Sequence, residues 1–159
     1  MKKKIKGIWF FGLSGSGKTY ASKKLKKKIN NSVLVDGDIV RKLISTDLKY
    51  SKKDREIQIK RIFGISKIII NSGMIPIVSS VYFNNEINNL CKKNKILVVR
   101  VDRIKFDKIK NKHKTYKNKI NVVGKDIFYE NLKTKILIND NKPFFFRNLV
   151  LAIDYNHVN

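Results

Sequence analysis

The sequence of 159 residues has a single cysteine, Cys91. A lone cysteine cannot form a disulfide within the chain, and it excludes a metal site built from cysteines alone. Such sparing use of cysteine is typical of proteins in the reducing cytoplasm. The length suffices for one compact domain with a real core but not for two. We therefore expect a single domain over residues 1–159, without a second catalytic module.

Long hydrophobic runs are also missing. A helix that spans a membrane needs about 20 apolar residues, and no stretch of this sequence approaches that length. The lysines of the first residues and the apolar run at 8–11 resemble a secretory leader. However, Gly12 and Lys18 interrupt that pattern, and no small-residue cleavage site follows. We expect a soluble, cytoplasmic protein without a membrane partner.

Acidic residues are scarce. Asp and Glu number 12 against 36 Lys and Arg, so the formal net charge is +24. This charge would attract nucleic acids, anionic membranes or small polyanions. The abundance of Lys, Asn and Ile, with alanine only at Ala21 and Ala152, also fits A/T-biased coding. Because the lysines are scattered and do not interleave with aromatic residues, we do not expect nucleic acid as a partner.

The remaining pattern predicts an α/β fold. Short apolar runs indicate strands at 8–11, 33–35, 75–78, 96–101 and 135–138. Amphipathic segments indicate helices at 18–29, 51–73, 86–92, 105–110 and 144–153. Ser51 is the expected N-cap of the long helix, with Asp54 completing a capping box. Strands and helices that alternate at this spacing predict a five-stranded parallel sheet flanked by helices, joined by right-handed crossovers.

The segment after the first strand carries the strongest chemical signal. Residues 12–19, Gly-Leu-Ser-Gly-Ser-Gly-Lys-Thr, match the phosphate-binding P-loop pattern between a strand and a helix. Glycines let backbone N–H groups turn toward phosphates, Lys18 reaches the β and γ oxygens, and Thr19 ligates Mg²⁺. We therefore predict a P-loop NTPase fold that uses ATP and Mg²⁺. The predicted ATP-binding residues are Gly12, Ser14, Gly15, Ser16, Gly17, Lys18 and Thr19.

Two carboxylates, Asp36 and Asp38, follow the second predicted strand. They lie at the carboxyl edge of the sheet, where ligands bind in open α/β folds. One carboxylate can orient a metal-bound water while the other accepts a hydroxyl proton. The alternative is a plain Asp-Gly turn. Three arginines nearby, at 41, 55 and 61, could bind an anionic acceptor, although each alone is also common on protein surfaces.

These blocks together resemble the adenylylsulfate kinases. The resemblance covers 9–19, 35–41, 47–51 and 54–55 in order and spacing, with a weaker echo at 121–130. It implies a P-loop kinase, usually a homodimer, that transfers the ATP γ-phosphate to the ribose 3′-hydroxyl of a 5′-activated nucleotide. It also implies that Lys18 and Asp38 are catalytic and that Tyr50 stacks on the acceptor base. The implied acceptor-binding residues are Asp36, Asp38, Arg41, Tyr50, Arg55, Gln58, Ser80 and Val122.

The sequence departs from the family on the acceptor side. Gln58 replaces an asparagine, Phe83 follows Tyr82 where the family has an arginine, and Val122 replaces a phenylalanine. A smaller pyrimidine with a neutral amidate group would suit these changes. Relatives of the adenylylsulfate kinases in bacterial capsule pathways phosphorylate cytidine diphosphoramidate, and this resemblance implies it as the expected acceptor. Adenylyl sulfate is the alternative acceptor, and a nucleic-acid-binding P-loop protein is a distant alternative.

The segment at about 111–130 lacks a clear periodicity. We expect it to form a polar loop that serves as an active-site lid. The arginine and aspartate usual in the family's lid are replaced here by lysine-rich sequence. His113 lies in this segment, where it is either a phosphate contact or a solvated loop residue.

Overall fold

The structure is a computed structural model, and it describes residues 5–117, 119–143 and 145–147. Its sheet has five strands in the order β2-β3-β1-β4-β5, and each neighbouring pair is parallel. The strands are β1 (Gly7–Phe11), β2 (Ser32–Asp36), β3 (Ile75–Ser80), β4 (Ile96–Arg103) and β5 (Lys135–Asn139). The predicted five-stranded parallel sheet is confirmed.

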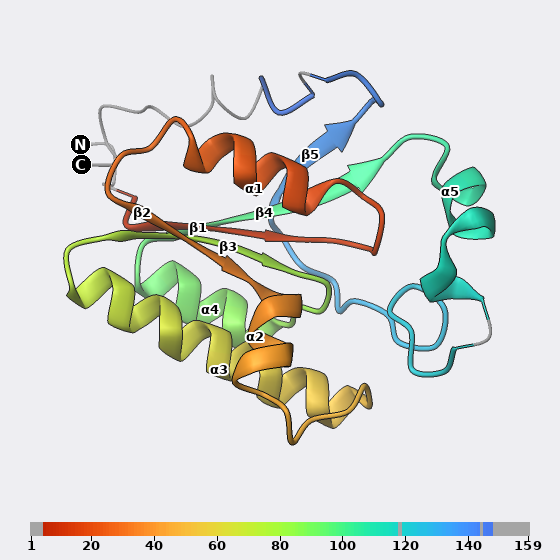
Figure 1. Cartoon of the computed structure of the whole chain (residues 1–159), viewed down its shortest axis with the longest axis horizontal. Helices are drawn as coiled ribbons and strands as arrows, with labels where there is room; N and C mark the ends of the chain where they lie inside the picture. Colours follow the sequence, from red (N-terminus) through yellow and green to blue (C-terminus); the bar gives the residue numbers. More distant parts are fainter. Residues whose placement is uncertain (1–4, 118, 144, 148–159) are drawn as a thin grey trace.

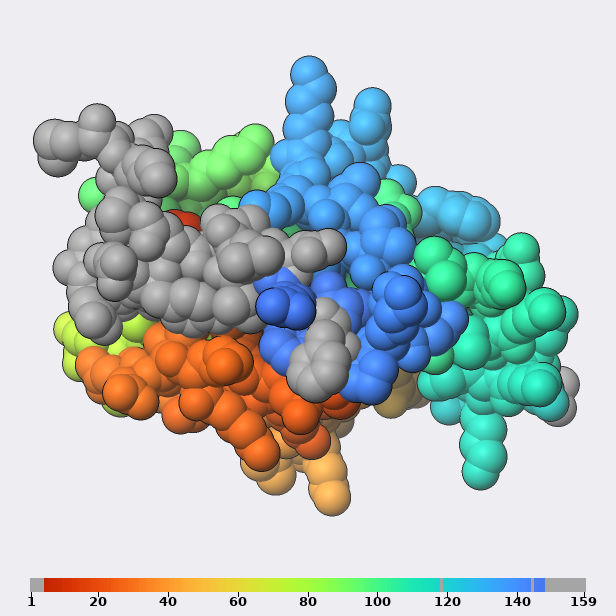
Figure 2. All heavy atoms as spheres, turned by 90° about the horizontal axis from the view of Figure 1, so that it is seen from above, coloured from red at the N-terminus to blue at the C-terminus, as the bar shows by residue number. Residues whose placement is uncertain are grey.

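Helices cover both faces of this sheet (Figure 1). One face carries α1 (Lys18–Lys26), and the other carries α3 (Lys52–Asn71) and α4 (Asn85–Lys93). Two short helices, α2 (Gly37–Leu43) and α5 (Phe106–Lys112), and the 3₁₀ turn η1 (Lys114–Tyr116) lie beyond the carboxyl ends of the strands. Seen from above, α5 and the turn after it form one end of the molecule (Figure 2). None of the helices that the structure describes is both long and apolar enough to cross a bilayer.

The central strand β1 is buried along its whole length because it has neighbours on both edges and helices on both faces. Trp9 and Phe11 point toward the α3 and α4 side, where they pack with Phe83. Ile8 and Phe10 point to the opposite side and pack with residues of α1. A strand buried on both faces reads as a continuous apolar run, as residues 8–11 do.

The capping box at the start of α3 is confirmed. Ser51 Oγ accepts a hydrogen bond from Asp54 N at 3.1 Å, and Ser51 N donates to Asp54 Oδ2 at 3.2 Å. The hydrogen bond from the Ser51 hydroxyl holds the pKa of Asp54 below its usual value. This cap fixes where α3 begins and therefore where its first turns face the carboxyl edge of the sheet.

Several boundaries differ from those predicted. Helix α1 ends at Lys26 and not at Ile29, although Ile29 is still buried in the turn that follows. Helix α2 was not predicted, because a seven-residue helix that begins at a glycine has little periodicity to detect. The segment 111–130 is not the fully polar loop that we expect from the sequence, because four of its apolar or aromatic side chains are buried: Tyr116, Val122, Val123 and Ile127. The helix predicted at 144–153 lies mostly outside the described residues, which include only 145–147 of this range.

Candidate active site

A cavity of about 880 Å³ lies at the carboxyl edge of the sheet. It brings together most of the predicted site residues: Ser14, Gly15, Lys18, Thr19, Asp36, Asp38, Arg41, Tyr50, Arg55, Gln58, Ser80 and Val122. The predicted residues that do not line it are Gly12, Ser16 and Gly17, whose part is to shape the loop. Ser14 and Val122, which are 108 positions apart in the chain, thus line the same cavity.

Glycines give the P-loop its path. Gly15 and Gly17 have φ angles of +87° and +105°, in the left-handed region that other residues rarely adopt. At Gly17 a Cβ atom would come within 2.6 Å of Asn139 Nδ2, so the loop also needs glycine there for space. Helix α1 then begins at Lys18, so its N-terminal N–H groups point at the cavity.

Four side chains hold the consecutive carbonyl groups of this loop. Leu13 O accepts from Lys18 Nζ at 2.9 Å, and Ser14 O accepts from the Tyr116 hydroxyl at 3.1 Å. The next two carbonyls are bound in the same way: Gly15 O by Arg103 Nη1 and Ser16 O by Asn139 Nδ2, both at 2.9 Å. Because a trans peptide turns its N–H away from its C=O, these bonds fix the N–H groups of the same peptides on the opposite side.

The P-loop motif does not predict three of these donors. Arg103 ends β4, Asn139 ends β5 and Tyr116 ends η1, so all three are far from the loop in sequence. What they share is the carboxyl edge of the sheet, which only the strand order reveals. The loop is therefore held in shape by side chains from three other elements.

Lys18 is buried although it carries a charge. Its residue is 7% exposed, and burial lowers the pKa of its ammonium group from 10.5 to about 8. The negative charges of Asp38 and Asp36 oppose this shift but do not cancel it. A partly desolvated cation binds a phosphate more strongly than a solvated one does. The site is therefore electrostatically prepared for an anionic ligand.

Asp36 collects hydroxyl and amide donors around its carboxylate. Its Oδ2 accepts from Thr19 Oγ1 at 3.4 Å and from Ser79 Oγ at 3.2 Å. Its Oδ1 accepts from Asp38 N at 2.9 Å and so caps α2. Hydroxyl and carboxylate oxygens are the metal ligands that Mg²⁺ prefers. In nucleotide sites the ion binds only one or two such protein groups, together with water and the substrate phosphates. This donor set fits Mg²⁺, even though the described residues contain no cluster of three or more acidic, His or Cys ligands.

Asp38 has no hydrogen bond or ion pair through its carboxylate among the described residues, and it lines the cavity. Arg41 and Arg55 lie nearby, with their guanidinium groups 4.9 and 5.6 Å from the centre of the Tyr50 ring. Arg55 also donates to Tyr50 O at 3.1 Å and to Asn121 O at 2.8 Å. The cavity thus presents one free carboxylate beside two cations.

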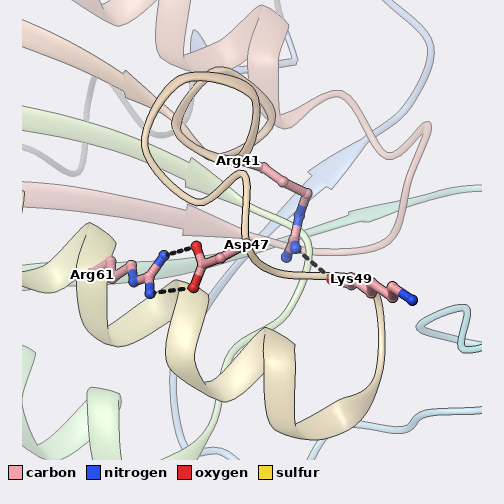
Figure 3. Close-up of polar contacts among 4 residues, drawn as sticks. All are labelled: Arg41, Asp47, Lys49 and Arg61. Carbon is pink, nitrogen blue, oxygen red and sulfur yellow. Dashed lines mark hydrogen bonds and ion pairs between the residues drawn. The ribbon is translucent and has the colours of Figure 1, made fainter.

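The loop between α2 and α3 is held from both sides (Figure 3). Arg61 donates two hydrogen bonds to Asp47, at 2.5 and 2.8 Å. This hydrogen bonding holds the pKa of Asp47 below its usual value. Arg41 Nη1 donates to Lys49 O at 2.6 Å. Arg61 is therefore engaged with Asp47 and, unlike Arg41 and Arg55, does not line the cavity. Its role is to hold the loop that carries Tyr50.

Three residues of the acceptor-side prediction take part in different ways. Gln58 is 4% exposed, and its Nε2 donates to Gly37 O at 3.0 Å. The Ser80 hydroxyl accepts from Trp9 Nε1 and donates to Tyr82 O, so it is already used in the core. Val122 is 4% exposed and contributes an apolar part of the cavity wall. Ser80 thus shapes the wall and has no hydroxyl donor to spare for a ligand.

Comparisons of the sequence with known proteins point to one family. The family model of adenylylsulphate kinase matches residues 4–106. The chain is 40% identical over 78 residues to the probable adenylyl-sulfate kinase of Synechocystis sp., covering 46% of this chain and 44% of that protein. It is 37% identical over 90 residues to the adenylyl-sulfate kinase of Bacteroides fragilis, covering 54% and 45%. The matched part of the chain thus spans about half the length of these curated relatives.

A solved structure is similar over almost the whole chain. It is the APS kinase CysC of Mycobacterium tuberculosis in complex with AMPPNP and APS, with a TM-score of 0.77. The match covers 97% of this chain and 98% of that one, at 24% sequence identity. At this identity the likeness shows a shared fold, which agrees with the predicted P-loop NTPase fold.

Proposed function

The chain belongs to the adenylylsulphate kinase family, and from this premise we propose that it transfers the γ-phosphate of ATP to the ribose 3′-hydroxyl of adenylyl sulfate. The observation that carries the proposal is a single cavity lined by both Lys18 of the P-loop and the free carboxylate of Asp38. A phosphoryl donor and a hydroxyl acceptor must meet in one place, and these two residues provide for each partner. The matched family region, 4–106, contains both.

The residues have distinct roles in this reaction. The N–H groups of the P-loop and the Lys18 ammonium bind the β- and γ-phosphates and stabilise the charge that develops on them. Asp38 aligns the acceptor hydroxyl and takes its proton as the oxygen attacks the γ-phosphorus. The new bond joins the 3′-oxygen to the γ-phosphorus, the bond to the β,γ-bridging oxygen breaks, and ADP leaves. Positioning and electrostatics supply most of the rate enhancement.

Thr19 and Asp36 are the residues that would hold Mg²⁺ together with the ATP phosphates. When bound, the ion offsets negative charge on the phosphate oxygens. The 3.4 Å separation between Thr19 Oγ1 and Asp36 Oδ2 places two oxygen donors together at the mouth of the P-loop. Ser79 shares the same carboxylate oxygen and holds it in place.

The choice of acceptor has changed from the sequence-based expectation. Cytidine diphosphoramidate rested on the acceptor-side departures, whereas the curated relatives that the chain matches are named adenylyl-sulfate kinases. Their similarity favours adenylyl sulfate, and capsule biosynthesis finds no support among them. One structural observation still favours cytidine diphosphoramidate, because its amidate end is neutral. Phe83, at the family's arginine position, is fully buried against Phe11 and cannot contribute a cation to the cavity.

A paired acceptor assay decides between the two acceptors. ADP release is measured with purified protein, ATP and Mg²⁺, with either adenylyl sulfate or cytidine diphosphoramidate as the acceptor. We expect kcat/KM to be at least about tenfold higher for adenylyl sulfate, because one good base or charge contact has this effect. The reverse ratio would overturn the proposed acceptor while leaving the kinase chemistry in place. Release of ADP that neither acceptor accelerates would overturn the kinase itself.

Three further expectations from the sequence are kept as proposals. The chain forms one P-loop kinase domain over 1–159, the segment at about 111–130 acts as its lid, and the protein is a homodimer. The buried contacts of Tyr116 and Val122 support a lid that packs on the site. Light scattering of the purified protein measures the oligomeric state, and a mass equal to one chain of 18.5 kDa would contradict the dimer.

A further inference from the structure

The imidazole ring of His113 lies against the P-loop. A Cβ atom added to Gly15 would be 3.2 Å from His113 Cδ2 and 3.7 Å from Nε2. The ring edge that carries Nε2 therefore faces the loop within van der Waals range. His113 is half-buried and lines the same cavity as Lys18 and Asp38. Its surroundings are those of a site residue and not those of a solvated loop residue.

The backbone and one ring nitrogen fix the orientation of this side chain. His113 N donates to Ile109 O at 2.8 Å, and His113 O accepts from Tyr116 N at 3.0 Å. Nδ1 accepts a hydrogen bond from Thr115 N at 3.3 Å. Because the lone pair of Nδ1 is used as an acceptor, the neutral ring carries its proton on Nε2. Nε2–H is therefore a donor in both the neutral and the charged ring.

Tyr116 anchors the turn that carries His113. Its hydroxyl donates to Ser14 O in the P-loop at 3.1 Å, and its ring contacts that of His113 edge-on, with 5.9 Å between centroids. The Phe106 ring also packs edge-on against the Tyr116 ring, with 6.0 Å between their centroids. His113 is thus held next to the loop by contacts from both ends of the segment 106–116.

We propose that His113 is a nucleotide-binding residue whose Nε2–H donates a hydrogen bond to a phosphate oxygen of the bound nucleoside triphosphate. The proposal rests on the proposed function, since it requires that the cavity bind ATP. Lys18 provides a charge from within the P-loop, and His113 adds a directional donor from the segment that covers the loop. A bound triphosphate would therefore link this segment to the P-loop.

Binding measurements with two ligands test the proposal. Isothermal titration in the presence of Mg²⁺ gives the affinity for the ATP analogue AMPPNP and for inorganic tripolyphosphate, which has neither base nor sugar. We expect His113→Ala to weaken both by about tenfold, the effect of one hydrogen bond to a charged group. His113→Gln, whose amide can donate, should recover part of the loss. Asn111→Ala, an exposed neutral substitution in the preceding helix α5, is the matched control and should bind like the wild type.

The outcomes separate this inference from the proposed function. Equal affinities of wild type and His113→Ala would overturn the proposed role of His113 but would leave the proposed kinase function standing. A loss confined to AMPPNP would place the contact on the base or sugar and would also overturn it. If the wild type binds neither ligand, the proposed kinase function fails as well.

A measurement on the unaltered protein guards against variants that do not fold. Long-range ¹H–¹⁵N spectra of the histidine rings report which nitrogen carries the proton, and His113→Gln assigns the signal. We expect the Nε2–H form in the free protein and a shift of the Nε2 resonance when AMPPNP is added. An Nδ1–H form, or an Nε2 resonance that does not move, would contradict the proposal.

Discussion

The two halves of the cavity are built differently. On the phosphate-donor side, four consecutive carbonyls of the P-loop are each bound by a side chain, and glycines with positive φ set the path of the loop. On the acceptor side, the cations bond to backbone carbonyls of Lys49, Tyr50 and Asn121, and the Asp38 carboxylate has no hydrogen-bond partner in the described part of the chain. One half is a fixed backbone cradle, whereas the other is a set of side chains on separate elements.

This difference indicates where specificity can change. In the proposed function, backbone N–H groups of the donor side bind phosphate, and the side chains that hold these groups in place lie mostly outside the ligand's reach. The acceptor side depends on individual side chains, and the departures from the family pattern, such as Gln58 and Val122, lie there. A P-loop kinase can thus keep its phosphate-donor site while its acceptor site changes. The predictions below test this division, from the largest expected effect to the smallest.

Lys18→Ala tests the donor side most severely. In the proposed mechanism the ammonium group contacts the phosphates that gain charge in the transition state, so its loss should lower turnover by about a thousandfold. ADP release is the measurement, and circular dichroism checks that the fold is kept. Lys26→Ala, at the exposed end of α1, removes a lysine outside the cavity and serves as the control. Turnover that survives Lys18→Ala would remove this residue from the mechanism.

Asp38→Asn tests the acceptor side in a way that leaves the donor side intact. The amide keeps the size of the side chain but cannot take the hydroxyl proton, so turnover should fall by about a hundredfold. AMPPNP affinity should stay close to that of the wild type, because the P-loop contacts are unchanged. The exposed carboxylate of Asp107 provides the control, Asp107→Asn. An undiminished rate would mean that another group receives the proton.

The lowered pKa of Lys18 predicts how nucleotide affinity depends on pH. In the free protein the ammonium group loses its proton as the pH rises through about 8. A bound triphosphate favours the charged form, so binding above pH 8 requires uptake of a proton and becomes weaker. AMPPNP affinity should be nearly constant below about pH 7, fall by about twofold between pH 7 and 8 and fall by about fivefold between pH 8 and 9. Lys18→Ala should abolish this fall, and a fall of equal size in that variant would assign it to another group.

Val122→Phe tests whether the acceptor side can be altered without touching the donor side. Val122 lines the cavity, and its backbone N–H, which donates to Asp126 Oδ2, is not changed by the substitution. A ring at this position can stack on a purine, which is worth about 1–3 kcal/mol per base in nucleic-acid binders. We expect KM for adenylyl sulfate to fall by about fivefold, the lower end of that range, while AMPPNP affinity stays the same. An unchanged KM would contradict a base-stacking role for this position.

The sequence predicts local features of the molecule well. Each strand shows as an apolar run, and the box of Ser51 and Asp54 marks the start of α3, because both signals arise within a few residues. The P-loop is predictable for the same reason. The short helix α2 is not predictable in this way. Its N-cap residue, Asp36, is also the last residue of β2, so the sequence shows no separate start signal for the helix.

Features that depend on strand order were out of reach of the sequence. Arg103 and Asn139 bond to neighbouring P-loop carbonyls only because β1 lies beside β4, and β4 beside β5.

The sequence also groups Arg61 with the anion-binding arginines, yet its partner is Asp47, 14 residues away along the chain. An arginine has the same appearance in a sequence whether it faces a ligand or a neighbouring carboxylate.

Identification of the reaction product tests the central claim most directly. Purified protein is incubated with ATP, Mg²⁺ and adenylyl sulfate, and the nucleotides are analysed by mass spectrometry and ³¹P NMR. We predict ADP and an acceptor that has gained one phosphate as a monoester on its 3′-oxygen, in equal amounts, and both should form about a thousandfold more slowly with Lys18→Ala. ADP formed together with free phosphate, and an acceptor that remains unmodified, would contradict the claim that Lys18 and Asp38 bring a triphosphate and a sugar hydroxyl together.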